Sequence, residues 1–255
     1  MDSEDYFKPK ISIITVVYNS ENLIERTILS VIGQSFKNIE YIIIDGLSKD
    51  KTIDFIKKYQ DNIEFWISEK DAGIYDAMNK GLNKATGNYV LFLNSGDELH
   101  DVDTLKNIFN NKQPLKDVYY GHTEIYNEQK ESLGDRRLKP PVSLNWKSLK
   151  YGMVVCHQSF IVKRELASYY NLKYKIAADI DWMIRCLRKS KEIQNTHGYI
   201  SKYIAGGVSR KNIIKSLMER FEIMVKNYGV FQVVICHFII AMKFFSYLAI
   251  NRKIN

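Results

Sequence analysis

The chain has 255 residues, of which 45% are hydrophobic and 26% charged, and its formal net charge is +8. This length and composition are typical of a globular protein with a sizeable core, and they exclude a disulfide-stapled miniprotein, a collagen-like repeat and a disordered chain. The three cysteines lie far apart and form no C-x-x-C pair, so neither a disulfide framework nor a structural zinc site is expected. This cysteine content fits a protein of a reducing compartment.

The N-terminal segment, residues 1–5, is acidic and carries no apolar run, so no secretory signal peptide is expected.

Residues 1–120 alternate between strand and helix patterns. Continuous apolar runs predict buried strands, and apolar residues at helical spacing predict the helices between them. The predicted strands are Ile11–Val17, Ile39–Ile44, Ile63–Ile67, Tyr89–Leu93 and Val118–Tyr120. The predicted helices are Glu21–Gln34, Asp50–Tyr59, Ile74–Ala85 and Asp101–Asn110.

Strand–helix alternation of this kind predicts an α/β fold with a Rossmann-like, mostly parallel sheet flanked by helices. From about residue 122 the pattern weakens, and Asp135–Pro141 is expected to be a loop. Ser159–Val162 then predicts a strand, and Asp179–Arg188 and Asn212–Tyr228 predict helices.

The C-terminal segment is both basic and apolar. Residues 202–255 hold nine Lys and Arg against two Glu, and 17 of the 21 residues in Val230–Ile250 are apolar. Lys243 makes a spanning helix unfavourable, so we expect a helix that lies in a membrane interface, flanked by Lys226, Arg252 and Lys253. A helix buried against a partner subunit remains the alternative. No sequence signature of a nucleic-acid-binding module occurs.

Acid-bearing segments directly follow the first four predicted strands. Because the carboxyl ends of parallel strands share one edge of a sheet, these segments are expected to gather there, where ligands bind. Asp45 suits the imide N–H of a uracil or the hydroxyls of a ribose, although a turn aspartate before Gly46 would look the same. Asp97 suits a Mg²⁺ or Mn²⁺ ion, which needs only one or two protein carboxylates; a turn with a helix cap is the alternative.

Asp179 and Asp181 stand at the start of a predicted helix. Residues two apart on a helix do not share a face, so different roles are expected for the two carboxylates. One of them suits a general base for an acceptor hydroxyl, whereas capping of the helix N-terminus is the alternative. The motifs of a P-loop NTPase, a dinucleotide-dependent dehydrogenase and an α/β-hydrolase do not occur.

In combination, these segments resemble the GT-A fold, family 2 (inverting) nucleotide-sugar glycosyltransferases of bacterial surface-polysaccharide assembly. The resemblance is strong over residues 11–105 and patchier from 150 to 210. Where the family often has D-S-D-D as its metal motif, this chain has N-S-G-D, which keeps only the last carboxylate. The matching segments are Ile11–Asn19 with Glu21, Ile42–Thr52, Ser68–Gly81, Asn94–Asp97, Cys156–Ser159, Ala178–Trp182 and Gly206–Ser209.

The resemblance implies a role for each matching residue. Asp179 is implied to be the catalytic base, although Ala178 stands where the family has a glutamate. Asp97 is implied to bind the divalent metal, Mg²⁺ or Mn²⁺, and His157 and Asp181 are implied to lie on the acceptor side. The residues implied to bind the nucleotide sugar are Thr15, Val17, Asn19, Glu21, Asp45, Asp71, Asn79, Asn94, Ser95 and Arg210.

The function that follows is inverting transfer of a sugar from a nucleotide-diphosphate sugar, with UDP as the favoured carrier, to a lipid-linked glycan in polysaccharide or O-antigen synthesis. A single displacement needs no covalent nucleophile. Two other classes stay open. Asn94 and Gly96 in the metal motif allow a catalytically silent nucleotide-sugar-binding scaffold. A sugar nucleotidyltransferase is also open, although the segment after the first strand lacks the Gly-rich basic loop that it needs.

The expected organisation has two parts. A GT-A catalytic domain spans residues 1–210, with a nucleotide-sugar-binding half over 1–120 and an acceptor half over 121–210. A C-terminal helical segment over 211–255 is expected to associate with a membrane. The resemblance implies a cytoplasmic location, peripheral to the inner face of the bacterial plasma membrane. The expected partners are therefore the sugar donor, the glycan acceptor and the membrane surface, and not a nucleic acid.

Overall fold

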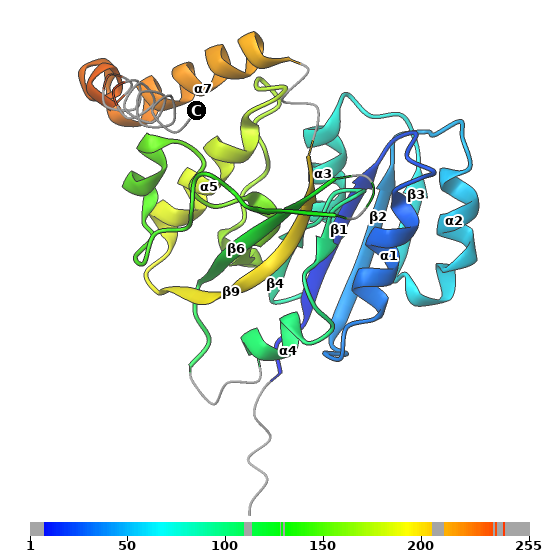
Figure 1. Ribbon diagram of the computed structural model, residues 1–255. Coiled ribbons are helices and arrows are strands. Elements are labelled where there is room, and N and C mark those ends of the chain that lie inside the picture. The colour runs from blue at the N-terminus through cyan, green and yellow to red at the C-terminus, as the bar shows by residue number, and fades with distance from the viewer. Residues whose placement is uncertain are drawn as a thin grey trace, which may run out of the picture.

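The computed structural model describes residues 8–109, 114–127, 129, 131–205, 212–236, 238 and 242. Its centre is a curled mixed sheet with the strand order β3-β2-β1-β4-β8-β6-β9-β5, and β7 pairs with β6 beside this path (Figure 1). The strands are β1 Ile11–Val17, β2 Ile39–Asp45, β3 Phe65–Ser68, β4 Tyr89–Phe92, β5 Glu98–Leu99, β6 Val118–Tyr126, β7 Ser132–Asp135, β8 Phe160–Lys163 and β9 Ile193–Ile204.

Helices cover both faces of this sheet. One buried apolar cluster joins the sheet to α1, α2 and α4, and the other joins it to α3, α5 and α7. Every residue of β1 is buried, as expected for a parallel strand covered on both sides. The α-helices are α1 Ile24–Ile32, α2 Thr52–Lys58, α3 Ile74–Lys84, α4 Thr104–Phe109, α5 Ala178–Lys189 and α7 Ile213–Tyr228. The short 3-10 helices are η1 Gln60–Asn62, η2 Trp146–Tyr151, η3 His157–Ser159 and η4 Arg164–Leu166.

The predicted α/β fold is confirmed. β1, β2, β3 and β4 pair in parallel, as the strand–helix alternation indicates. Beyond them, β8 runs antiparallel to β4 and β6, while β9 is parallel to β6. The structure therefore combines a parallel half with a mixed half.

Two corrections concern the mixed half. The strand predicted at Val118–Tyr120 extends to Tyr126, and its continuation pairs with Ser132–Asp135, so the predicted loop begins only after Asp135. The strand Ile193–Ile204 is not evident from the sequence, because half of its residues are polar and most of its residues are only half-buried. It is a strand because its backbone pairs with β6, and its side-chain pattern alone does not indicate this pairing.

The amino edge of the parallel strands is held by one buried carboxylate. Glu40, in β2, accepts hydrogen bonds from Ser12 of β1 and from the backbone and hydroxyl of Thr86, which precedes β4. Lys10 pairs with the same carboxylate at 3.1 Å. Although burial opposes ionisation, these hydrogen bonds lower the pKa of Glu40 to about 2. Glu40 thus ties three neighbouring strands together as an anion.

The C-terminal helix α7 packs on the face that also carries α5 (Figure 1). Ile223 and Met224 are buried against the core. Tyr228 stacks on Trp146 with ring centroids 5.5 Å apart and donates to its carbonyl oxygen at 2.5 Å. Within the residues that can be described, no helix is long and apolar enough to cross a membrane.

Candidate active site

Three segments meet at the carboxyl edge of the parallel strands: the loop after β4, the 3-10 helix η3 and the first turn of α5. The loop carries Asn94 and Asp97, η3 carries His157 and Gln158, and α5 carries Asp179. Asn94 Nδ2 lies 3.2 Å from His157 Nε2, and His157 Nδ1 lies 3.5 Å from Asp179 Oδ2. Gln158 Nε2 donates to Asp97 Oδ2 at 2.8 Å. The structure therefore brings four sequence-predicted site residues close together, in two sets of polar contacts that the neighbouring residues His157 and Gln158 of η3 hold side by side.

The orientation of His157 follows from its two neighbours. Nδ1 faces the Asp179 carboxylate at 3.5 Å, and Nε2 faces the Asn94 amide at 3.2 Å. A tautomer that carries its proton on Nδ1 and accepts from the Asn94 amide at Nε2 fits both neighbours. The amide group of Asn94 then directs its Oδ1 atom away from the histidine. That oxygen is buried and has no hydrogen-bond partner, which is costly unless a ligand supplies one.

Asp97 is a carboxylate in an unfavourable place for its charge. The residue is 5% exposed. Burial raises the pKa of its carboxyl to about 7, although the hydrogen bond from Gln158 and the proximity of His157 act in the opposite direction. A cation bound next to Asp97 would relieve this electrostatic penalty.

The oxygens of this loop fit a hard divalent cation. Asp97 offers a carboxylate and Asn94 offers an amide oxygen with no other partner. Mg²⁺ and Mn²⁺ use few protein oxygens and complete their shell with water and phosphate. No cluster of three or more His, Cys, Asp or Glu side chains suited to a metal occurs in the described part of the chain, so the remaining ligands would come from the substrate and solvent.

Three residues predicted to bind the nucleotide sugar, Asn19, Glu21 and Asp45, hold the loop that follows β2 in place. Asn19 Oδ1 accepts from the Lys49 backbone at 2.8 Å, and Glu21 Oε2 accepts from the Lys51 backbone at 3.0 Å. Asp45 is fully buried and accepts from Ser48 and Ser68. These side chains therefore shape the loop, with Asp45 beneath it.

The other residues predicted to bind the nucleotide sugar lie in different surroundings. Thr15 is buried and donates to the Leu93 carbonyl, and Val17 lies at the end of the same buried strand. Ser95 Oγ bonds to Ser20 Oγ at 2.9 Å, next to the site. Asp71 caps the turn before α3 by accepting from Gly73. Asn79 is used elsewhere, since both ends of its amide bond the backbone of Tyr170. Arg210 lies outside the described residues.

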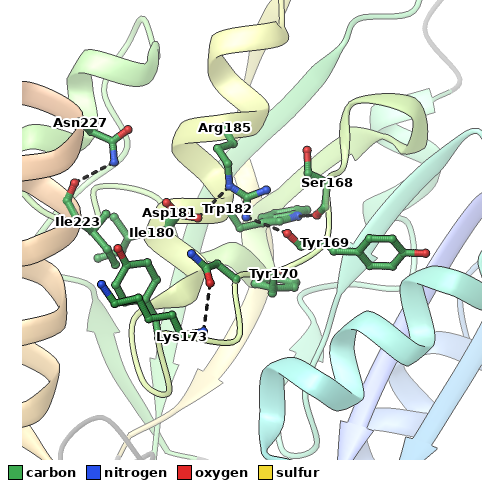
Figure 2. Close-up of polar contacts among 12 residues, drawn as sticks. Ser168, Tyr169, Tyr170, Lys173, Ile180, Asp181, Trp182, Arg185, Ile223 and Asn227 are labelled. Carbon is green, nitrogen blue, oxygen red and sulfur yellow. Dashed lines mark hydrogen bonds and ion pairs between the residues drawn. The ribbon is translucent and has the colours of Figure 1, made fainter.

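Asp181 is separated from the network by the geometry of α5. Figure 2 shows its carboxylate directed toward Arg185, one turn further along the helix, with Nε and Oδ2 2.8 Å apart. Arg185 also donates to the Tyr169 carbonyl. Asp181 is 3% exposed and its partner Arg185 is half-buried, so the structure places Asp181 in a partly buried ion pair within α5, whereas Asp179 faces His157. The different roles expected for the two aspartates match this arrangement.

Two residues near the network carried no role in the sequence-based prediction. Gln158 stands next to His157 in the sequence, and the H-Q pair was the signal that pointed to it. Tyr75, on α3, donates to the Ile176 carbonyl at 2.8 Å. Burial, helped by the charge of Asp179, raises the pKa of Tyr75 well above its usual value, so its hydroxyl remains a donor. No local pattern around Tyr75 distinguishes it from a core tyrosine.

Comparisons with known sequences identify the family of the chain. Residues 12–170 match the family model described as glycosyl transferase family 2. A PGL/p-HBAD biosynthesis glycosyltransferase of Mycobacterium bovis (strain BCG / Pasteur 1173P2) is 28% identical over 228 residues, covering 86% of each chain. An uncharacterized glycosyltransferase of Haemophilus influenzae is 30% identical over 230 residues, covering 86% of this chain and 88% of the relative.

Solved structures share the fold. S. aureus TarS in complex with UDP superposes with a TM-score of 0.66 at 19% identity, over 85% of this chain and 64% of that chain. The mannosyltransferase PcManGT from Pyrobaculum calidifontis, in complex with GDP-Man and Mn²⁺, gives a TM-score of 0.63 at 16% identity, over 87% of this chain and 65% of that one. The chain thus spans just under two thirds of the length of these structures.

Proposed function

The chain belongs to glycosyl transferase family 2 and has a GT-A fold, and from this premise we propose that it is an inverting transferase that moves a sugar from a nucleotide-diphosphate donor to a glycan acceptor. The observation that carries the proposal is the polar cluster at the carboxyl edge. There His157 lies between Asn94 and Asp179, and the next residue in the sequence, Gln158, donates to Asp97. This edge is where open parallel sheets bind ligands.

In the proposed reaction Asp179 is the general base. It removes the proton from an acceptor hydroxyl, the oxygen of which attacks the anomeric carbon of the donor sugar. The bond from that carbon to the nucleoside diphosphate breaks on the opposite face, so the anomeric configuration inverts in one displacement. His157 Nδ1 lies 3.5 Å from Asp179 Oδ2, and this polar contact would favour an orientation of the carboxylate toward the acceptor side.

The donor is proposed to bind over the loops after β1, β2 and β4. Asn94 and Asp97 would hold a Mg²⁺ or Mn²⁺ ion, which when bound supplies positive charge for the diphosphate leaving group. The residues that brace the loop after β2 would shape the nucleotide pocket, with Asn19 and Glu21 holding backbone and Asp45 underneath. UDP is the proposed carrier. TarS has been solved with UDP and PcManGT with GDP-Man and Mn²⁺, which supports a choice between these two nucleotides.

The acceptor is proposed to be a lipid-linked glycan at the cytoplasmic face of a membrane. Support comes from an apolar stripe on α7, formed by Ile213, Ile214, Leu217 and Met218, whose side chains are all more than half exposed. Lys215 and Lys226, on the same helix, are exposed cations that suit an anionic surface. The catalytic domain would then be residues 1–210, and residues 211–255 the membrane-associating segment.

Membrane association has a direct test. The chain is expected to co-sediment with vesicles that contain anionic phospholipid and less with zwitterionic vesicles. The double variant Ile214→Ser and Met218→Ser is expected to lose binding. Val142→Ser, which changes an apolar residue that is 85% exposed elsewhere on the surface, is the matched control and should bind as the wild type does. Equal binding by the double variant would contradict the role of the stripe.

Transfer itself is tested by product formation. The purified chain is incubated with UDP-glucose, UDP-N-acetylglucosamine or GDP-mannose, Mn²⁺ and polyprenyl-phosphate-linked sugar acceptors. We expect release of the nucleoside diphosphate with one donor and an inverted anomeric configuration in the product by NMR. A retained configuration would contradict the single displacement, and nucleotide binding without any release would favour a silent scaffold.

A further inference from the structure

Three consecutive backbone N–H groups just before α5 converge on a single carboxylate. Lys175 donates to Glu219 Oε1 at 2.9 Å, and Ile176 and Ala177 donate to Glu219 Oε2 at 2.8 and 3.0 Å. Glu219 belongs to α7, more than 40 residues further along the chain. Both oxygens of one side chain are therefore committed to the backbone of residues 175–177.

This carboxylate holds the backbone that leads into a helix without a side-chain cap. The N-cap residue of α5 is Ala177, which has no side-chain group to cap the helix. Helix N-termini leave backbone N–H groups without intrahelical partners, and a Ser or Asp at the cap usually satisfies one of them. Here Glu219 satisfies the preceding groups from another element. The hydrogen bonds are charge-assisted and are accordingly stronger than those to a neutral acceptor.

The same loop is held from its other side by α3. Tyr75 donates to the Ile176 carbonyl at 2.8 Å, so the two faces of this short segment are bonded to two different helices. Tyr75 is 6% exposed and stacks on Tyr170 with ring centroids 5.2 Å apart, and Tyr170 stacks in turn on Trp182. The loop thus connects a rigid part of the donor half to the C-terminal helix.

Asp179 follows this clamped loop by two residues. Its Oδ1 atom accepts from the Ile180 backbone at 2.9 Å and its Oδ2 atom faces His157. The position of the carboxylate is therefore set by the backbone that precedes it. A general base acts only within hydrogen-bond reach of the proton that it removes, so a shift of this loop would slow proton transfer while leaving the donor site intact.

We propose that Glu219 is a positioning residue for glycosyl transfer: from α7 it holds the backbone of residues 175–177 and so fixes Asp179 at the place where it meets the acceptor hydroxyl. The inference rests on the proposed role of Asp179 as the base. It gives the C-terminal helix a part in catalysis, because the helix that carries the exposed apolar stripe also holds the reaction centre.

The test compares two glutamates on one helix. Glu219→Gln keeps the shape of the side chain but removes the charge, and its NH₂ group cannot accept from a backbone N–H. Glu222→Gln makes the same change three residues later, where the carboxylate is exposed and pairs with Lys173. With the best donor and acceptor, we expect kcat of the Glu219→Gln variant to fall about 10- to 100-fold with the KM for the donor within about twofold. The Glu222→Gln variant should retain the wild-type kcat.

Two further variants separate positioning from folding. Glu219→Asp restores the carboxylate and is expected to recover part of the lost kcat. Tyr75→Phe removes the hydroxyl that donates to the Ile176 carbonyl and also interacts with Asp179, and it should lower kcat in the same direction by a smaller factor. Circular dichroism at the assay temperature gives the folded fraction of each variant, so the rates are compared per folded molecule.

The outcomes that overturn the inference are distinct. If Glu219→Gln and Glu222→Gln have equal kcat per folded molecule, Glu219 does not position the base. If Glu219→Gln raises the KM for the donor and leaves kcat unchanged, it acts on donor binding instead. A wild-type chain without transferase activity, or an Asp179→Asn variant with full activity, would contradict the proposed function itself and the inference with it.

Discussion

Glu40 at the amino edge and Asp97 at the carboxyl edge of the parallel strands are both buried carboxylates, but their surroundings shift their pKa values in opposite directions. At the amino edge, Glu40 is surrounded by donors and its pKa is lowered to about 2. At the carboxyl edge, Asp97 receives a side-chain hydrogen bond from Gln158, and burial raises its pKa to about 7. Near it, the Oδ1 atom of Asn94 is buried without a partner.

The difference indicates which buried acid serves stability and which serves binding. The amino edge has satisfied its charge from within the chain, so Glu40 joins strands and has no need of a ligand. The carboxyl edge keeps acceptors that the chain itself does not satisfy. Such groups destabilise the unliganded protein and are retained where a ligand completes them. The comparison therefore supports the proposed donor site at the carboxyl edge.

The largest effect is expected for Asp179→Asn. Removal of the general base should lower kcat by about 10²- to 10⁴-fold, because the amide of asparagine cannot take the proton from the hydroxyl of the acceptor glycan. Donor binding should be unchanged, since the loops after β2 and β4 are untouched. Steady-state kinetics and nucleotide-induced thermal shifts measure the two quantities. Asp54→Asn, at an exposed position on α2, is the matched control; a similar loss there, or none in Asp179→Asn, would contradict the assignment.

Asp97→Asn should make the unliganded protein more stable while it removes metal-dependent donor binding. Between about pH 4 and 7 the Asp97 carboxyl keeps its proton in the native state, whereas in the unfolded chain it is ionised. The native state is therefore destabilised relative to the unfolded chain as the pH rises through this range. In metal-free buffer the variant should gain about 1–3 kcal/mol at pH 8, with a much smaller gain near pH 4. Urea unfolding at both pH values measures this gain, and a loss of stability at pH 8 would be the opposite of the expected result.

Glu40→Gln should make the protein less stable, in contrast to Asp97→Asn. Its lowered pKa contributes stability that is present above the unfolded value of about 4.5 and is lost as the pH falls toward 2. The variant should therefore lose about 1–3 kcal/mol at pH 7, and the difference from the wild type should shrink at pH 3. Transferase activity per folded molecule should not change. A selective loss of activity would show that the two edges are not separate in function.

The smallest effect is expected for His157→Asn. The shorter amide can bond only one of the two partners of the imidazole ring, so Asn94 and Asp179 would no longer be joined. We expect kcat to fall by about tenfold, less than on removal of the base itself. Kinetics of this variant next to Asp179→Asn give the comparison. A loss as large as that of Asp179→Asn would assign His157 a direct role in proton transfer.

Local patterns predicted the parallel half well. Ile11–Val17 is a strand with the predicted bounds, because an unbroken β-branched run has few alternatives. Asn94 and Asp97 follow β4 at the carboxyl edge, as the strand-end expectation predicts, whereas His157 and Asp179 reach that edge from η3 and α5, which the expectation did not cover. Those residues stay proposed in their roles, since the geometry brings them together without a bound ligand.

Residues whose role depends on distant partners were not predictable. Glu219 lies among apolar residues on an amphipathic helix, and only the fold places it under residues 175–177. Glu40 has the pattern of an ordinary polar position in a strand until Thr86 is brought beside it. The strand Ile193–Ile204 was missed for the same reason, because its pairing with β6 and not its side-chain periodicity makes it a strand.

The most direct test of the assignment of the donor site is thermal unfolding with UDP, GDP and dTDP, each with and without Mn²⁺, for the wild type, Glu40→Gln and Asp97→Asn. At a nucleotide concentration about 100 times its Kd, binding contributes about 2.7 kcal/mol, which corresponds to a rise of about 5–10 °C in Tm. We expect one nucleotide to produce this rise with Mn²⁺ in the wild type and in Glu40→Gln, and not in Asp97→Asn. An equal rise in Asp97→Asn, or no rise with any nucleotide in the wild type, would contradict a metal-dependent donor site at the carboxyl edge.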